Sequence, residues 1–528
     1  MTWLAETAML SHGWRRFALL LLAGAVAGLS VPPLFVVPAL FVSFPLWVWC
    51  LDGAGRQRSW RRVLGPAFTI GFAFGWGYFI VAFHWLGAAF LLEGGWFLAL
   101  MPPAILALAA LIALFWGLAS AMAYLCWSHG AWRLVTLAAW LGLAEYARGT
   151  LFSGFPFDLL GYALTGTPEM LQLASLVGVY GLTLLAALLA MTPALIWPAD
   201  GRALVVRLVP FFLAVAALAG QLGYGNWRLG ATPVTPRPDF AVRLVQPLIT
   251  EHANWAAANP PEIVSRLLEV TGDPAGRDLI VWPESVFPFF LSTYPEALAR
   301  IARFLPDGTT LLTGAPREPE ILSADPSENP GYNSVLAIDT NGEIVASYDK
   351  AHLVPFGEYL PFAGFWRLFG ITQFVPGTNG WAPGDGRRLV APPGLPPFIA
   401  LICYEAIFSG DLGADPAAAQ FILNISNDEW FDGSIGPAQH AHHALLRAVE
   451  SGLPLLRATN SGVTFAADPL GRVTAKLAPG APGALDVTLA EPLAPTLFDR
   501  LGNIPFLVLV ALGLVAGLLT RTRKPRRV

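Results

Sequence analysis

The chain has 528 residues, of which 55% are hydrophobic and only 13% are charged, and its formal net charge is −4. A soluble protein of this length carries about 25% charged residues, so the composition excludes an ordinary soluble protein. The small net charge gives no indication of nucleic-acid binding.

Long apolar runs fill the N-terminal part of the chain and recur once near its end. Each approaches the ~20 residues that a membrane-spanning helix needs. A stretch with mixed charges and Gly/Pro turns precedes the last run. The sequence therefore predicts a membrane domain at 1–222, a globular domain at 223–500 and a final span with a basic tail at 501–528. We expect eight spans, at about 17–32, 35–51, 66–88, 97–126, 132–147, 171–197, 204–222 and 503–520.

Basic residues cluster at three places beside these spans: Arg15-Arg16, four arginines between 56 and 62, and the tail 521–527. Basic loops tend to stay in the cytoplasm. With eight spans, all three clusters and both termini lie on that side. The loop 148–170 and the domain 223–500 then lie on the outer face. The stretch 148–164, which contains Arg148, is expected to pack against that domain or to line a lipid entry.

Cysteine is scarce, and this topology separates the three cysteines of the chain. Cys50 and Cys126 fall near cytoplasmic ends of spans, whereas Cys403 is alone on the outer face. A single thiol in an oxidising compartment is a liability unless it is buried or used. Both a buried packing role and a catalytic role remain open at this point.

Short apolar runs alternate with helical patterns in the globular domain. Runs of β-branched residues and leucine indicate strands that are covered on both faces. We therefore expect an α/β layered sandwich. The predicted strands are 240–247, 278–284, 309–315, 333–339, 397–405 and 420–427, and the predicted helices are 260–271, 294–305 and 436–451.

Polar residues stand where strands end: Glu284, Cys403 and Asn427 at three of the strands above, and Lys350 after a further run, "IVASYD" (344–349). Active sites commonly gather at strand ends, where a rigid sheet aims side chains into a cleft. Taken singly, Glu284 also suits a helix start and Lys350 a solvated turn. Taken together, they supply a nucleophile, a base and a cation for an oxyanion.

Three sequence blocks carry a resemblance to a known superfamily. "WPES" (282–285), "YDKAHLVPFGEYLP" (348–361) and "ICYEAIF" (402–408) resemble the signature blocks of the nitrilase superfamily, in the same order Glu, Lys, Cys. With the spans, "SNDEWF" (426–431) and "GPAQH" (436–440), the chain is similar over essentially its whole length to the bacterial apolipoprotein N-acyltransferases. The resemblance implies an αββα catalytic domain on the periplasmic face of the inner membrane. It also implies a phospholipid acyl donor, a diacylated apolipoprotein acceptor and no cofactor.

The residue types suit acyl transfer. A free thiol is mostly protonated at neutral pH and needs a base or a nearby cation. Glu284 is expected to take the Cys403 proton, and Lys350 to stabilise the thiolate and the later oxyanion, with help from the Tyr404 backbone N–H. The resemblance further implies that Glu358 orients the reacting groups and that Glu405 holds the lysine. By the same matching, the residues expected to contact substrate or to shape the site are Trp255, Asn333, Tyr404 and Asn427.

The expected reaction has two half-steps. Cys403 takes an acyl chain from a phospholipid as a thioester, and the thioester passes it to the α-amino group of an N-terminal diacylglyceryl-cysteine, with ping-pong kinetics. Two alternatives remain. One is a membrane-anchored amidase that uses the same three residues, and the other is a non-enzymatic transporter or sensor.

Two further features have competing interpretations. His440 and His443 stand one helical turn apart, which suits paired metal ligands, but with no cysteine or carboxylate nearby in the sequence we expect no metal.

The stretch 360–375 is rich in aromatic residues and too short to span. It packs on the domain's core, or dips into the membrane interface as a lid. The lid residues would be Phe362, Phe365, Trp366 and Phe369.

Overall fold

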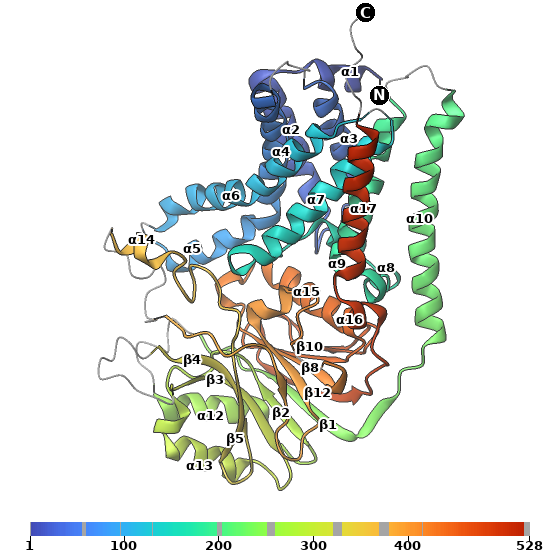
Figure 1. The fold of residues 1–528 in the computed structure, drawn as a ribbon. Helices are drawn as coiled ribbons and strands as arrows, with labels where there is room; N and C mark the ends of the chain where they lie inside the picture. Colours follow the sequence, from blue (N-terminus) through green and yellow to red (C-terminus); the bar gives the residue numbers. More distant parts are fainter. Residues whose placement is uncertain are drawn as a thin grey trace, which may run out of the picture. The chain divides into compact units, whose positions relative to one another are not determined.

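The computed structural model describes residues 2–54, 60–95, 97–128, 130–197, 203–250, 259–319, 330–368, 380–413 and 416–521. They form two compact units. The first unit contains the chain up to Ala231, the short stretch Gly433–Ile435 and the chain from Arg500 onward. The second unit contains Thr232–Asp432 and Gly436–Asp499. Both units appear in Figure 1.

The first unit is helical, as its apolar runs predict. A helix lies at the position of every predicted span, and short helices stand beside them. The long helices are α2 (Gly13–Gly28), α3 (Pro38–Asp52), α4 (Trp60–Phe83), α6 (Phe97–Leu125), α7 (Trp132–Thr150), α9 (Ala174–Met191), α10 (Leu204–Ala231) and α17 (Ile504–Thr520). The short ones are α1 (Thr2–Leu10), α5 (Ala88–Glu93) and α8 (Pro168–Leu171).

Four stretches of the described chain are long and apolar enough to cross a membrane: Leu64–Leu92, Leu98–Leu125, Ala174–Leu195 and Leu204–Ala231. The helices α3 and α17 are apolar but shorter. Large apolar side chains such as Phe212 and Leu213 are exposed on α10, as suits a helix with lipid around it. The chain is therefore a membrane protein with several candidate spans, and the count of eight stays a prediction.

A buried ion pair lies inside the first unit. The Arg148 guanidinium donates to both carboxylate oxygens of Glu145 at 2.6 and 3.0 Å, and to the carbonyls of Phe155 and Phe157. Trp116 Nε1 donates to the same carboxylate at 2.8 Å. Both charged side chains are fully buried. Arg148 therefore fastens the chain after α7 within its own unit, and the packing of the stretch 148–164 against the outer domain or a lipid entry stays a prediction.

The second unit contains two six-stranded sheets; their strands are drawn as arrows in Figure 1. The first sheet has the order β12-β1-β2-β3-β4-β5 and the second the order β11-β10-β9-β8-β7-β6. The strands of the first are β1 (Pro236–Gln246), β2 (Leu279–Trp282), β3 (Thr310–Arg317), β4 (Tyr332–Ile338), β5 (Ile344–Asp349) and β12 (Gly483–Ala490). Those of the second are β6 (Leu389–Val390), β7 (Phe398–Ile402), β8 (Phe421–Ser426), β9 (Leu455–Thr459), β10 (Phe465–Ala467) and β11 (Val473–Lys476).

Three apolar layers explain why these strands are apolar on both faces. Alternate residues of both sheets, such as Leu244 and Leu423, form one core between the sheets. The other face of the first sheet packs on α12 (Pro260–Thr271) and α13 (Pro295–Phe304). The other face of the second sheet packs on α15 (Gly436–Ser451). The layers run helix, sheet, sheet, helix, so the predicted α/β sandwich with its six strands and three helices is confirmed.

The strand directions place the carboxyl ends of several strands at one edge of each sheet. In the first sheet β1, β2 and β3 are parallel, and β5 has the same direction because it is antiparallel to β4, which is antiparallel to β3. In the second sheet β7, β8 and β9 are parallel. Residues that directly follow β2, β5, β7 and β8 can therefore meet.

Candidate active site

The four polar residues predicted at strand ends occupy those positions. Glu284 comes two residues after β2, Lys350 directly after β5, Cys403 directly after β7 and Asn427 directly after β8. Glu284, Lys350 and Asn427 are buried, and Cys403 is half-buried. Two sheets thus contribute to one cluster of polar groups.

Lys350 lies between two carboxylates. Its Nζ donates to Glu358 Oε1 at 2.8 Å and to Glu284 Oε1 at 3.3 Å. Burial lowers the pKa of Lys350, but the negative charges of Glu284 and Glu358 outweigh burial and hold it well above its ordinary value. The lysine is therefore a permanent cation in this site, as an oxyanion stabiliser requires.

Each carboxylate is also fixed by groups other than the lysine. Asn333 Nδ2 donates to Glu284 Oε1 at 2.8 Å and to Glu358 Oε1 at 3.2 Å. The backbone N–H of Asn427 donates to Glu284 Oε2 at 2.9 Å, and that of Val354 to Glu358 Oε2 at 2.8 Å. These donors orient Glu284 and Glu358, so Asn333 and Asn427 shape the site.

Cys403 sits on a strained corner between β7 and the short helix η7 (Cys403–Ile407). Its φ of 48° lies in the left-handed region, which costs a non-glycine residue about 1–3 kcal/mol and recurs at functional sites. Burial and the charge of Glu284 raise the pKa of the thiol well above its ordinary value, and Lys350 offsets them only in part. The resting cysteine is therefore a thiol, and attack requires a base that removes its proton.

Glu405 has a different contact from the one that the resemblance implies. Its Oε1 accepts from the backbone N–H groups of Ala351 and His352 at 2.9 and 3.1 Å, and from the Tyr348 hydroxyl at 2.9 Å. Its Oε2 accepts from Ile402 N–H at 2.8 Å. Glu405 thus holds the chain after Lys350, not the lysine amine, and fastens it to the corner that carries Cys403.

The remaining expected site residues fall in three groups. Tyr404 is buried at the start of η7, its ring 5.3 Å from that of Phe408. Trp255 and Phe369 lie outside the described residues, and so does the side chain of Phe365. Phe362 is 73% exposed with a φ of 55°, whereas Trp366, on α14 (Ala363–Arg367), is half-buried and donates to the Pro361 carbonyl.

A second polar cluster, formed by Asp428, His440 and Arg457, contacts the backbone of Cys403. The sequence analysis does not predict it. His440, near the start of α15, has Nδ1 2.8 Å from Asp428 Oδ1 and Nε2 2.9 Å from the Cys403 carbonyl oxygen. Arg457 of β9 donates to Asp428 Oδ2 at 2.8 Å. A charged residue inside the apolar strand "LLRAT" was the signal that could have indicated a buried ionic partner.

This cluster also corrects the reason given against a metal. Ligand atoms of Cys403, Asp428 and His440 all lie within 4.8 Å of one another, so a cysteine and a carboxylate do stand beside His440. The imidazole and carboxylate atoms already have protein partners, and the Arg457 guanidinium on Asp428 opposes a second cation. The three ligand atoms are of types that bind metals, but the positive charge of Arg457 beside them disfavours a metal ion.

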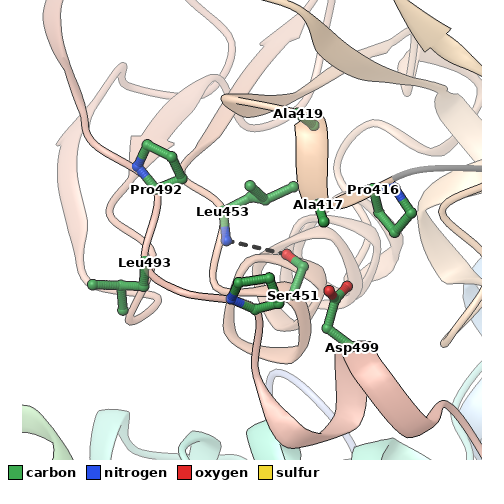
Figure 2. Close-up of a pocket in the computed structure, with 9 residues that line it drawn as sticks. Pro416, Ala417, Ala419, Ser451, Leu453, Pro492, Leu493 and Asp499 are labelled. Carbon is green, nitrogen blue, oxygen red and sulfur yellow. Dashed lines mark hydrogen bonds between the residues drawn. The ribbon is translucent and has the colours of Figure 1, made fainter.

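A small cavity of the second unit lies elsewhere. Pro416, Ser451, Leu453, Leu493 and Asp499 are among the residues that line it, and Figure 2 shows the Leu453 N–H donating to Ser451 Oγ. Its volume of about 40 Å³ has room for about three water molecules. It contains none of the strand-end residues and is too small for a lipid chain.

The fold and the strand-end cluster together are those of the carbon-nitrogen hydrolase class. Residues 242–493 match the carbon-nitrogen hydrolase family, and residues 23–192 match the apolipoprotein N-acyltransferase N-terminal domain. Among solved structures, an amidase of the nitrilase superfamily from Nesterenkonia AN1 is 21% identical and covers 48% of this chain and 92% of that one, with a TM-score of 0.30.

Full-length relatives narrow the class to a family. The apolipoprotein N-acyltransferase of Rhodopseudomonas palustris is 40% identical over 99% of this chain and 98% of that relative. That of Agrobacterium fabrum is 42% identical over 92% of each chain. The chain belongs to the apolipoprotein N-acyltransferase family and is an acyltransferase of the nitrilase superfamily.

Proposed function

We propose that this chain moves an acyl chain from a phospholipid to the α-amino group of an N-terminal diacylglyceryl-cysteine, through a thioester on Cys403. The observation that carries the proposal is the buried Lys350 ammonium, which Glu284 and Glu358 hold where its charge offsets in part the rise in the pKa of Cys403. The family to which the chain belongs supports the two lipid partners.

The first half-step forms the thioester. Glu284 takes the thiol proton as the sulfur attacks the ester carbonyl of the phospholipid, and Lys350 and the Tyr404 N–H stabilise the oxyanion. The C–O bond then breaks, and the lysophospholipid leaves with the proton returned by Glu284. In the second half-step the amine nitrogen attacks the thioester, Glu284 takes its proton, and the thiol departs with that proton.

The proposed topology places the second unit on the periplasmic face of a bacterial inner membrane, with eight spans and both termini in the cytoplasm. The three basic clusters support this orientation. Phospholipid and lipoprotein are both anchored in that membrane, so a thioester lets them use one site in turn. We also propose that the segment 360–375, of which residues 369–375 lie outside the described residues, serves as a lid over the site at the membrane interface.

Family membership favours this activity over the two alternatives. A transporter or sensor has no need of a buried base, a buried cation and a thiol at converging strand ends. An amidase would use the same groups but pass the acyl group to water. The identity of the acyl acceptor therefore decides between the two enzymes.

The test is the intact mass of purified protein incubated with phospholipid, followed by peptide mapping. We expect one acyl adduct, on Cys403, that disappears when a diacylated lipopeptide is added and reappears on the lipopeptide amine. Cys50 and Cys126 serve as internal controls and should stay unmodified. An adduct that is lost to water at the same rate without lipopeptide would favour the amidase, and the lack of any adduct would refute the covalent mechanism.

A further inference from the structure

His440 bridges the nucleophile's backbone and a buried carboxylate. Its Nε2 is 2.9 Å from the Cys403 carbonyl oxygen, and its Nδ1 is 2.8 Å from Asp428 Oδ1. The three residues come from different elements: α15, the end of β7 and the end of β8. His440 and Asp428 are both buried, at 7% and 2% exposure. Water therefore does not substitute readily for either bond.

The partners of His440 determine its protonation. A backbone carbonyl can only accept a hydrogen bond, and an ionised carboxylate can only accept one. Arg457 Nη2 donates to Asp428 Oδ2 at 2.8 Å and Ser426 Oγ to Oδ1 at 2.9 Å. Burial raises the pKa of Asp428, but the charges of Arg457 and His440 outweigh burial and lower it. Both ring nitrogens of His440 consequently have an acceptor within hydrogen-bond distance, an arrangement that an imidazolium satisfies with one donor at each; Arg457 Nη2 also lies 3.4 Å from Nδ1.

The His440 imidazolium lies beside Cys403, whose backbone is strained. The Cys403 carbonyl belongs to the residue whose φ is 48°, so a hydrogen bond to it holds the corner in the left-handed region. The negative charge of Asp428 raises the pKa of the Cys403 thiol. The groups that face His440 from the packed elements are Asp428, Arg457 of β9 and Cys403 itself. Without His440, Asp428 would retain one cation instead of two.

We propose that His440, as an imidazolium between Asp428 and the Cys403 carbonyl, is a positioning residue of the acyl transfer. It fixes the backbone that aims the sulfur, and its charge offsets that of Asp428 near the thiolate. The proposal rests on the nucleophilic role of Cys403 argued above. In this proposal His440 acts through the backbone of Cys403, whereas Lys350 acts on the reacting atoms.

The experiment compares His440→Ala with His443→Ala in the full-length protein. His443 is one turn further along α15 and is also buried, so it controls for damage to the helix. Two rates are measured: acyl adduct formation on Cys403 from phospholipid vesicles, and alkylation of Cys403 by iodoacetamide as a function of pH, quantified by peptide mass. The melting temperature of each variant is recorded.

His440→Ala should slow adduct formation about 10²-fold, the loss typical of a reacting group displaced by about 1 Å. Its alkylation profile should move to higher pH, because the thiolate loses a nearby cation and keeps the Asp428 anion. His443→Ala should leave the profile unmoved. An unmoved profile in His440→Ala, or equal losses in both variants, would overturn the proposal.

A paired variant separates position from charge. In His440→Gln with Asp428→Asn, the glutamine amide can donate to the Cys403 carbonyl and accept from the asparagine, so both hydrogen bonds persist without charges. We expect most of the adduct rate to return and the alkylation profile to lie near that of the wild type. A pair as slow as His440→Ala would refute the positioning role. Failure of the proposed function is distinct, since the wild type would then form no adduct at all.

Discussion

The two sheets of the second unit have the same strand pairing but contribute different chemistry. Each has three parallel strands flanked by antiparallel ones. The first sheet supplies the charges that act on reacting atoms, Glu284 and Lys350. The second supplies the nucleophile and the ionic cluster behind it, Cys403 with Asp428 and His440. The proton acceptor and the nucleophile thus stand on two frameworks, the two sheets, which are joined where the Asn427 N–H bonds Glu284 and where Glu405 bonds the chain after β5.

Removing the nucleophile from the second sheet should have the largest effect. Cys403→Ala should abolish both the acyl adduct and transfer to a diacylated lipopeptide, because no other group at these strand ends can form the thioester. The first sheet's lysine and carboxylates remain in place in this variant. Mass spectrometry of the enzyme and of the lipopeptide checks it, with Cys50→Ala as the matched control. N-acylation by Cys403→Ala would exclude the thioester mechanism.

Changing the first sheet should separate proton transfer from thiolate stability. Glu284→Gln should slow adduct formation about 10²–10⁴-fold, the usual contribution of a general base. The same change should make alkylation of Cys403 faster at a given pH, because the Glu284 charge raises the thiol's pKa.

Lys350→Met should slow both reactions, since the lysine lowers that pKa and stabilises the oxyanion. Both rates, alkylation of Cys403 and formation of the acyl adduct, are measured on one preparation of each variant. Effects of the same sign on alkylation in Glu284→Gln and Lys350→Met would contradict the assignment of base and cation.

Sequence alone could locate the polar residues at the strand ends of both sheets, but not the contacts that hold them. Glu284, Lys350, Cys403 and Asn427 each follow a visible apolar strand, so their positions could be inferred. The partners of Glu405 could not be inferred, because Glu405 bonds backbone N–H groups, which nearly every residue has. His440 was noticed, but helical spacing paired it with His443. Its true partners, Asp428 and the Cys403 carbonyl, become neighbours only when β7 and β8 end side by side.

The link between the two frameworks should have an intermediate effect. Glu405 accepts from the chain after β5 through Oε1 and from Ile402 before the cysteine through Oε2. In Glu405→Gln one oxygen becomes an amide donor, which cannot accept from a backbone N–H. We expect a loss of about 1–3 kcal/mol in the free energy of unfolding, as for a buried donor left unpaired. We also expect a roughly tenfold slower adduct rate, as 1.4 kcal/mol of lost positioning would give.

Thermal unfolding and adduct kinetics check this prediction. Glu269→Gln, at an exposed ion pair on α12, is the matched control and should change neither quantity. Unchanged stability in Glu405→Gln would mean that the two frameworks do not depend on this link.

The smallest effect on chemistry should come from the lid, which belongs to neither framework. Phe362 and Leu368 are 73% and 81% exposed, and Trp366 is half-buried with its indole N–H bonded to the Pro361 carbonyl. Apolar side chains so exposed suit the membrane interface, where Trp and Phe are favourable. Trp366→Asp should therefore slow adduct formation from bilayer phospholipid about tenfold, if roughly half of the ~3 kcal/mol available from burying such a side chain comes from lipid. Alkylation of Cys403 by a small soluble reagent should be unchanged, because the strand-end groups are untouched.

Val473→Asp, at an exposed position of β11, is the control and should leave both rates at the wild-type value. Equal losses of both rates in Trp366→Asp would mean that the second unit is misfolded, and full lipid loading would mean that the segment is not the gate.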